Sequence, residues 1–169
     1  MMIIKQATLK DALSLADIFI GHITAHPEYI SHGELQMGVG EGIIRDGVLE
    51  ARPAQDAREK WMRYIRRQIQ ATTCAKVWKA VDEDGIVGFC VADIEADGDA
   101  PFGVVCDLLV KPDYRGHGAG GALLQKALEW LRSKDVKGIY LESGKNNHAA
   151  HRFFEKRGFA HVSEIYKLA

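Results

Sequence analysis

Little in this sequence suggests covalent cross-links, a membrane span or a strongly charged partner. Its three cysteines, Cys74, Cys90 and Cys106, are odd in number and widely spaced, without histidines at metal-ligand spacing. This pattern argues against a disulfide framework and a zinc site, so we expect reduced thiols packed in strands. No stretch approaches the roughly 20 apolar residues that cross a bilayer. The net charge of −1 gives no overall field for nucleic acid or an anionic membrane.

What remains is the composition of an ordinary globular protein. Of 169 residues, 47% are hydrophobic and 27% are charged, which supplies enough apolar side chains for one continuous core. We therefore expect a single domain over residues 1–169 that is soluble and cytoplasmic, with neither nucleic acid nor a membrane among its partners. Self-association as a homodimer is left open.

The first two thirds of the sequence predict helices alternating with β-rich segments. Strands are expected over residues 3–7, 76–81, 86–94 and 102–110, and helices over residues 9–22 and 56–69. The Asp84-Gly85 pair predicts a hairpin turn, and a polar loop ending at Pro101 precedes the last strand. Between residues 26 and 51 glycines are frequent and the apolar residues show no period, which predicts a loop with a short helix.

After residue 110 the pattern changes from antiparallel strands to a crossover. Apolar residues recur at helical spacing over residues 118–133, and a short apolar strand over 138–143 and a helix over 147–157 follow. A strand, a helix and a second strand in this order imply a right-handed parallel connection. The predicted fold class is therefore α/β, with a mixed central sheet of about six to seven strands flanked by helices.

The most informative motif is a glycine-rich loop at residues 116–121, Gly-His-Gly-Ala-Gly-Gly, which lies between a predicted strand and a predicted helix. A loop with so few side chains lets a phosphate approach the backbone N–H groups. The first helical turn also offers unpaired donors and a partial positive charge, and Arg115 adds a full charge beside it. The motif therefore predicts a pyrophosphate-binding site.

The same hexapeptide also satisfies G-x-G-x-x-G, the fingerprint of dinucleotide-binding proteins, and Glu142 could imitate the ribose-binding acid. Two observations speak against this alternative. A dinucleotide loop begins directly after its strand, whereas residues 111–115 intervene here. The elements that follow Glu142 are also too few to complete a doubly wound sheet.

Two motifs in this region resemble those of the GNAT superfamily of N-acetyltransferases. Residues 107–124 resemble the central motif Arg/Gln-x-x-Gly-x-Gly/Ala, which Arg115, Gly118 and Gly120 fill. Residues 147–159, Asn-His-Ala-Ala-His-Arg-Phe-Phe-Glu-Lys-Arg-Gly-Phe, are similar to the family's Asn-x-x-Ala-x-x-x-Tyr-x-x-x-Gly-Phe helix. The resemblance implies a GNAT-like acyl-CoA N-acyltransferase fold.

The resemblance also implies that acetyl-CoA is the acetyl donor and co-substrate. In the family, the strands that correspond to residues 102–110 and 138–143 splay apart and admit the pantetheine arm, and a backbone N–H of the first strand donates to the thioester carbonyl. The pyrophosphate lies against the glycine loop, and an asparagine contacts the cofactor near its reactive end. The cofactor-binding residues expected from this are Leu108, Leu109, Val110, Arg115, Gly116, His117, Gly118, Ala119, Gly120, Gly121 and Asn147.

Acetyl transfer to an amine requires a base, because the attacking nitrogen must be neutral. Glu142 occupies the position at which a branch resembling the ribosomal-protein N-terminal acetyltransferases carries its catalytic glutamate. Asp107 is the second catalytic candidate, either as a base through water or as an anchor for a cationic acceptor. The family's usual tyrosine acid is Phe154 here, so Tyr140, Tyr114 or a water must be considered in its place.

The acceptor is expected to be a primary amine of a small cationic molecule or a peptide N-terminus. Residues 22–50, which cover the substrate in the family, have an acidic balance, with Arg45 set against Glu28, Glu34, Glu41, Asp46 and Glu50. A function of another class stays open, namely an acyl-CoA sensor that kept the cofactor loop and lost the acid. No metal site is expected, since His148 and His151 have no third ligand in the sequence pattern.

Overall fold

The computed structural model describes residues 1–96 and 100–169, which form two compact units. The first unit consists of Met1–Phe19 and Met62–Glu142, and the second of Ile20–Trp61 and Ser143–Ala169. Residues 97–99, which belong to the polar loop expected before Pro101, lie outside the described residues. Among the described residues, no helix is both long enough and apolar enough to cross a bilayer.

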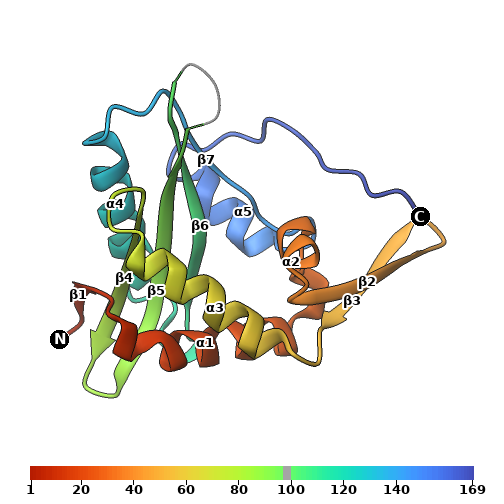
Figure 1. Cartoon of the computed structure of the whole chain (residues 1–169), viewed down its shortest axis with the longest axis horizontal. Helices are drawn as coiled ribbons and strands as arrows, with labels where there is room; N and C mark the ends of the chain where they lie inside the picture. The colour runs from red at the N-terminus through yellow and green to blue at the C-terminus, as the bar shows by residue number, and fades with distance from the viewer. Residues whose placement is uncertain (97–99) are drawn as a thin grey trace. The chain divides into compact units, whose positions relative to one another are not determined.

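A mixed sheet of five strands lies in the first unit, with the order β1-β4-β5-β6-β7 (Figure 1). The strands are β1 (Ile3–Gln6), β4 (Ala75–Asp82), β5 (Gly85–Glu95), β6 (Phe102–Val110) and β7 (Ile139–Leu141). The first four are antiparallel to their neighbours, whereas β7 runs parallel to β6. The expected mixed sheet is confirmed. It has five strands rather than six or seven, because two further strands pair only with each other in the second unit.

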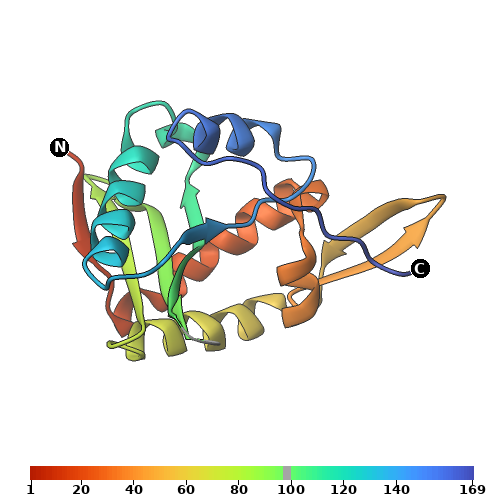
Figure 2. The same cartoon turned by 90° about the horizontal axis from the view of Figure 1, so that it is seen from above.

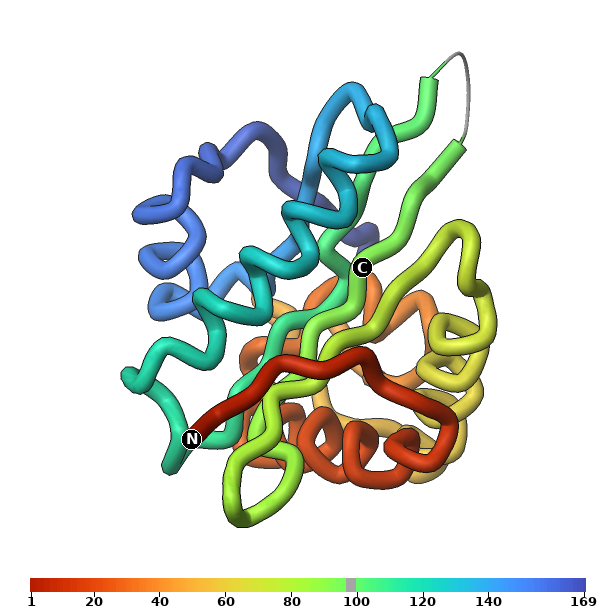
Figure 3. The backbone as a smooth tube through the Cα atoms, turned by 90° about the vertical axis from the view of Figure 1, so that its left-hand side faces the viewer, coloured from red at the N-terminus to blue at the C-terminus, as the bar shows by residue number. Residues whose placement is uncertain are grey.

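The β4–β5 hairpin places the most apolar strand inside the sheet. β4 ends at Asp82 and β5 begins at Gly85, whose φ of 98° lies in the left-handed region that favours glycine. The predicted hairpin is therefore confirmed. Residues 87–92 of β5 are all buried, as expected for a strand covered on both faces. Figure 3 shows β5 running between β4 and β6.

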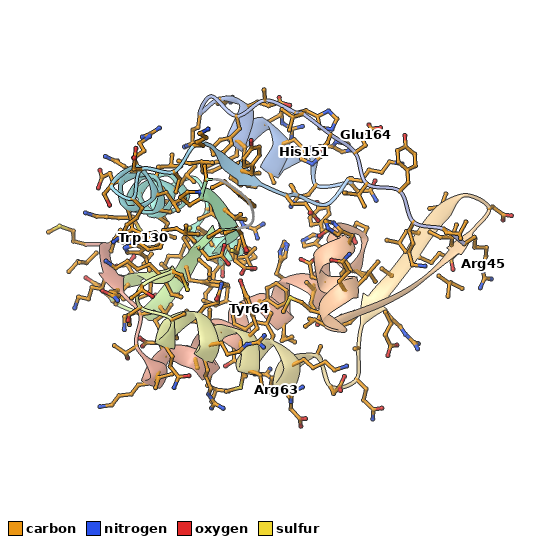
Figure 4. The ribbon with its side chains drawn as sticks, turned by 45° about the horizontal axis from the view of Figure 1, so that its top comes forward. Arg45, Arg63, Tyr64, Trp130, His151 and Glu164 are labelled. Carbon is orange, nitrogen blue, oxygen red and sulfur yellow. The ribbon has the colours of Figure 1, made fainter. Side chains whose placement is uncertain are left out.

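Helix α4 (Ala119–Arg132) packs against β4, β5 and β6, and it confirms the helix predicted over residues 118–133. Its buried side chains recur every three or four positions and belong to Ala119, Leu123, Leu124, Ala127 and Leu131. Trp130 stacks edge-on against Trp78 of β4, with 5.9 Å between the ring centroids (Figure 4). Leu131 lies so close to Gly103 of β6 that a Cβ there would come within 2.8 Å of the leucine side chain.

Two further helices correspond to those predicted over residues 9–22 and 56–69. A 3-10 turn, η1 (Leu9–Asp11), leads into α1 (Ala12–Ala25), and α3 (Ala57–Gln70) follows later in the chain. At the start of η1, the Thr8 N–H donates to Oδ2 of Asp11 at 2.7 Å, as in a capping box. Lys79 of β4 donates to both carboxylate oxygens of Asp11 at 2.8 Å, which fixes the start of α1 to the sheet.

The second unit contains a hairpin that the sequence analysis did not predict (Figure 2). The elements that lie wholly in this unit are η2 (Pro27–Tyr29), α2 (His32–Met37), β2 (Gly40–Arg45), β3 (Val48–Pro53) and α5 (His148–Glu155). The hairpin consists of β2 and β3. The short helix expected between residues 26 and 51 is confirmed as α2, but the loop expected around it is wrong where β2 pairs with β3. Asp46 and Gly47 form the turn, with φ of 51° and 76°. An Asp-Gly pair is the usual signal for such a turn.

Candidate active site

The C-terminal part of β6 has an open edge on the side of β7. β7 pairs with β6 only from Gly103 to Val105, whereas β5 pairs with β6 along its whole length. Within the described part of the chain, residues 107–110 of β6 therefore have a strand partner on one side only (Figure 1). Such an edge offers N–H and C=O groups to an extended ligand. Leu108, Leu109 and Val110, the residues predicted to contact the pantetheine arm, lie in this open part.

The glycine loop borders open space at the N-terminus of α4. Gly116 and Gly118 have φ of 80° and 88°, in the region where a side chain is strained. A Cβ added at either glycine would meet no heavy atom within 4 Å. Gly118 is the N-cap of a helix of 14 residues, so the N–H groups of the first turn, at Ala119, Gly120 and Gly121, belong to a helix start that attracts anions. The loop fits a pyrophosphate.

Two side-chain contacts connect this loop to the end of β6. The Arg115 Nε donates to the carbonyl oxygen of Val110 at 3.0 Å. His117 Nδ1 lies 3.0 Å from the carbonyl oxygen of Arg115. The structure thus brings together ten of the predicted cofactor residues, from the open edge of β6 through Arg115 to the loop. Asn147 is the one that belongs to the second unit.

Asn147 has a local structural role. It is the N-cap of α5, and its Oδ1 accepts a hydrogen bond from the Ala150 N–H at 3.2 Å, a contact that stabilises a helix start. The residue that replaces the family's tyrosine, Phe154, packs edge-on against Phe153 and Phe159, with centroid distances of 5.3 and 5.8 Å. The predicted contact between Asn147 and the cofactor stays a prediction.

Both candidate catalytic carboxylates lie near the point where β6 and β7 separate. Leu141 is the last residue of β7 and pairs with Val105 of β6. Glu142 follows directly and is exposed, and Asp107 lies two residues beyond Val105 and is half-buried. The two side chains thus come from the same end of neighbouring parallel strands. A proton acceptor is required there if the thioester lies along the open edge of β6.

Sequence reasoning missed a third group at this site, the Tyr64 hydroxyl. Tyr64 lies on α3 (Figure 4). Its hydroxyl donates to Oδ2 of Asp107 at 2.8 Å. Burial, together with the charge of Asp107, raises the pKa of Tyr64 well above its usual value. Tyr64 therefore keeps its proton and stays a hydrogen-bond donor. In the sequence, the helical spacing of Tyr64 with Trp61 and Ile65 is typical of an apolar helix face, which gives no sign of a polar contact.

The tyrosines considered as substitutes for the missing acid have other contacts. The Tyr114 hydroxyl donates to Asp84, and this bond, with the charges of nearby aspartates, raises the pKa of Tyr114 to about 12. A phenol with a raised pKa gives up its proton less readily. Tyr140 of β7 is 53% exposed and stacks edge-on against Phe102 at 5.9 Å.

The cysteines are thiols, and two of them lie beside the acidic groups of the site. Cys90 of β5 and Cys106 of β6 lie in strands as expected, but Cys74 is exposed and precedes β4 in a turn. Burial and the charges of Asp93 and Asp107 raise the pKa of Cys106. Burial and the charge of Asp107 likewise raise the pKa of Cys90, so neither strand thiol is a nucleophile near neutral pH.

The acidic balance predicted for residues 22–50 is smaller in the structure, because arginines in the hairpin offset two of the carboxylates. Arg45 Nε lies 3.4 Å from Glu50, and Arg52, beyond the stretch counted, lies 3.3 Å from Glu41. Glu34 accepts hydrogen bonds from Ser31 at the start of α2. A cationic acceptor stays a prediction, and the carboxylates at the end of the first unit's sheet are its main structural support.

Comparison with known proteins finds relatives that are named as acetyltransferases. The chain is 27% identical over 115 residues to N-alpha-acetyltransferase 30 of Schizosaccharomyces pombe, which covers 67% of this chain and 76% of that protein. It is 38% identical over 58 residues to streptothricin acetyltransferase A of Bacillus subtilis, which covers 34% of each protein. The fold is similar to the crystal structure, with acetyl-CoA, of a predicted acetyltransferase from Clostridium acetobutylicum. That comparison gives a TM-score of 0.72 at 17% identity, covering 100% of this chain and 96% of that chain.

A family model provides the decisive match. Residues 43–159 match the acetyltransferase (GNAT) family, and this stretch contains β6, the glycine loop, α4 and α5. The match spans more than half of the chain and includes both motifs noted in the sequence. The chain therefore belongs to the GNAT family of acetyltransferases, enzymes that take the acetyl group from acetyl-CoA.

Proposed function

We propose that this protein transfers the acetyl group of acetyl-CoA to a primary amine of a small cationic molecule or a peptide N-terminus, by direct attack in a ternary complex. The observation that carries the proposal is the placement of Asp107 and Glu142 at the end of the β6–β7 pairing, next to the open edge of β6. A thioester bound along that edge would have two carboxylates within the same region of the sheet.

The residues of the first unit divide the work of binding the co-substrate. The N-terminus of α4 and Arg115 hold the pyrophosphate, and the open edge of β6 pairs with the pantetheine amides. Acetyl-CoA, when bound, supplies an activated acetyl thioester. A backbone N–H of β6 donates to the carbonyl oxygen of this thioester, a contribution worth roughly 3 kcal/mol in comparable sites.

The acceptor amine must lose a proton before it attacks. Asp107 binds the acceptor while it is still an ammonium, and Glu142 then takes this proton, directly or through water. The nitrogen gives up a second proton as the amide forms, and the departing CoA thiolate can take it up. Because the usual pKa of a thiol is about 8.5, this thiolate is a tolerable leaving group without a strong acid. Phe154 in the position of the family's tyrosine is therefore compatible with turnover.

The comparisons favour an enzyme over an acyl-CoA sensor. Two of the curated relatives are named as acetyltransferases, an N-alpha-acetyltransferase and a streptothricin acetyltransferase. With Phe154 in place of the family's tyrosine, the chain lacks one proton donor, but it keeps the carboxylates of Asp107 and Glu142. The names of these two relatives correspond to the two acceptor classes in the proposal, a peptide N-terminus and a small amine.

The test is acetyl-CoA-dependent thiol release with spermidine, an aminoglycoside and short peptides with a free N-terminus. The same peptides with a blocked N-terminus are the matched control, because they lack the nucleophile. We expect thiol release together with an acetylated product by mass spectrometry. Binding of acetyl-CoA without release on any amine would instead support the sensor. Tighter binding of NAD than of CoA would contradict the assignment of the loop.

A further inference from the structure

Helix α3 donates hydrogen bonds to two aspartates on neighbouring strands. The Tyr64 hydroxyl donates to Oδ2 of Asp107 on β6 at 2.8 Å, and Gln68 Nε2 donates to Oδ2 of Asp93 on β5 at 3.1 Å. Tyr64 and Gln68 are four residues apart, so they lie on the same face of the helix. One side of α3 is therefore matched to a pair of carboxylates.

A β-bulge explains why both aspartates face α3. The pairing of β5 with β6 shifts after Val91, so that Cys106 is an extra residue in β6 and Asp107 pairs with Val91. Val91 is two residues from Asp93 on β5, so both point to the same face of the sheet, and directly paired residues also share a face. Asp107 consequently lies on the same face as Asp93.

The carboxylates of Asp93 and Asp107 lie partly buried between the sheet and α3, where a folded protein usually avoids negative charge. Asp93 Oδ1 is buried and lacks a well-formed hydrogen bond among the described residues; the neighbouring Cys106 thiol is only a weak donor to this carboxylate, which makes its burial costly. The two carboxylates also raise the pKa of the neighbouring Cys106 thiol, after the effect of burial. A cation brought to this face would offset the cost, and the acceptor of the proposed reaction carries one.

We propose that Tyr64 is a positioning residue, whose hydroxyl holds the Asp107 carboxylate in the orientation that binds the acceptor ammonium. This inference rests on the proposed function. Tyr64 does not act on the reacting atoms itself. Because it keeps its proton, it cannot serve as a base, and its hydroxyl is engaged with Asp107. Its effect on turnover passes through the carboxylate that it orients.

The first experiment replaces Tyr64 by Phe and measures steady-state kinetics with spermidine. Tyr64→Phe keeps the ring and removes the hydroxyl that donates to Asp107. We expect KM for spermidine to rise about 10-fold, because hydrogen bonds to charged groups are among the stronger ones, while KM for acetyl-CoA stays unchanged. Tyr166→Phe is the matched control, since Tyr166 also donates to a carboxylate, that of Glu164, but is 87% exposed.

A double-mutant cycle separates positioning from packing. In an Asp107→Asn background the Tyr64→Phe change should add no further rise in KM for spermidine, because the charge to be oriented is gone. An undiminished effect in that background would overturn the inference, and so would an unchanged KM in the single variant. The thermal unfolding midpoint and the calorimetric affinity for acetyl-CoA report folding of each variant.

Two further outcomes keep the test decisive. If Tyr64→Phe does not fold, Asp107→Asn is measured alone, since its amide oxygen can still accept from Tyr64 while the negative charge is lost. An unchanged KM for spermidine in that variant would overturn the role of Asp107 and hence of Tyr64. A wild-type enzyme that acetylates no amine would overturn the proposed function and this inference together. An active wild type with a silent Tyr64→Phe would overturn only the inference.

Discussion

The Arg115 Nε lies 3.0 Å from the carbonyl oxygen of Val110, the last residue of β6. This bond orients the guanidinium between the open strand edge and the glycine loop. A charged side chain held in this way binds a phosphate at a lower entropic cost than a mobile one. The same bond uses a donor nitrogen that a lysine cannot supply in this geometry.

We therefore expect Arg115→Ala to weaken acetyl-CoA binding by about 10-fold, within the range for one charged hydrogen bond. Arg115→Lys should recover only part of this loss, because lysine lacks the planar fork. Calorimetric titration with acetyl-CoA at low and high salt measures both. Full recovery by lysine would show that charge alone matters at this position.

Gly118→Val should abolish binding of acetyl-CoA. The substitution places a branched side chain in the open space at the start of α4, where the phosphate must approach the backbone N–H groups. The matched control is Gly47→Val in the β2–β3 turn, where φ is also positive, at 76°, and a Cβ also meets nothing within 4 Å. Each change should lower the free energy of unfolding by about 1–3 kcal/mol. Normal CoA binding by the Gly118 variant would place the pyrophosphate elsewhere.

Substitutions of Glu142 and Asp107 should change different kinetic parameters. Glu142→Gln should lower kcat by about 100-fold with little change in the affinity for acetyl-CoA, the low end of what a general base contributes. Asp107→Asn should chiefly raise KM for a cationic acceptor. Steady-state kinetics with spermidine at saturating acetyl-CoA measures both parameters. Equal and negligible effects would favour a base from the second unit or the sensor.

The pH–rate profile should rise with pH and then level off. The rise follows deprotonation of the acceptor, whose usual pKa is about 10.4 for an alkylammonium and about 8 for a peptide N-terminus, so the plateau distinguishes the two classes. No falling limb from a tyrosine is expected, and Phe154→Tyr should change kcat by much less than about 100-fold. A bell-shaped curve that disappears in Tyr140→Phe or Tyr114→Phe would identify a tyrosine acid.

Asp11 should make stability depend on pH below neutrality. Burial alone would raise its pKa, but the hydrogen bonds from Lys79 and Thr8 outweigh burial and hold the pKa of Asp11 below its usual 3.8. A carboxyl with a lowered folded pKa stabilises the protein above the unfolded value, and this stability is lost as pH falls through the folded value. Asp11→Asn should lower the free energy of unfolding at pH 7 by about 1–3 kcal/mol. The exposed Asp135→Asn is the control in urea titrations.

Much of the first unit could be predicted because local signals and tertiary structure agree there. The strand over residues 102–110 has the bounds of β6, and the Asp-Gly pair marks the β4–β5 turn. The β2–β3 hairpin escaped prediction because glycines at positions 40 and 42 interrupt the alternation, although Asp46-Gly47 has the same turn chemistry. A strand can be predicted from the local sequence only where apolar and polar side chains alternate along it.

The cofactor loop could be predicted from its residues, but the contacts around Asp107 could not. The Tyr64 hydroxyl and Asp107 are separated by 43 positions in the chain, and no spacing rule connects a helix residue with a strand residue at such a distance. The bulge at Cys106 is equally hidden, because the apolar run from Phe102 to Val110 reads as an uninterrupted strand. Register, unlike periodicity, is a property of the folded sheet.

The extra residue in β6 decides on which face of the sheet Asp107 lies. If Cys106 paired with Val91, as in a regular strand, Asp107 would pair with Cys90, which lies opposite Trp78 and thus on the face covered by α4. A slip of β6 that removed the bulge while keeping every residue would therefore turn the carboxylate away from any acceptor. Deletion of Cys106 should instead be tolerated, because the strand then pairs without a bulge and Asp107 stays opposite Val91.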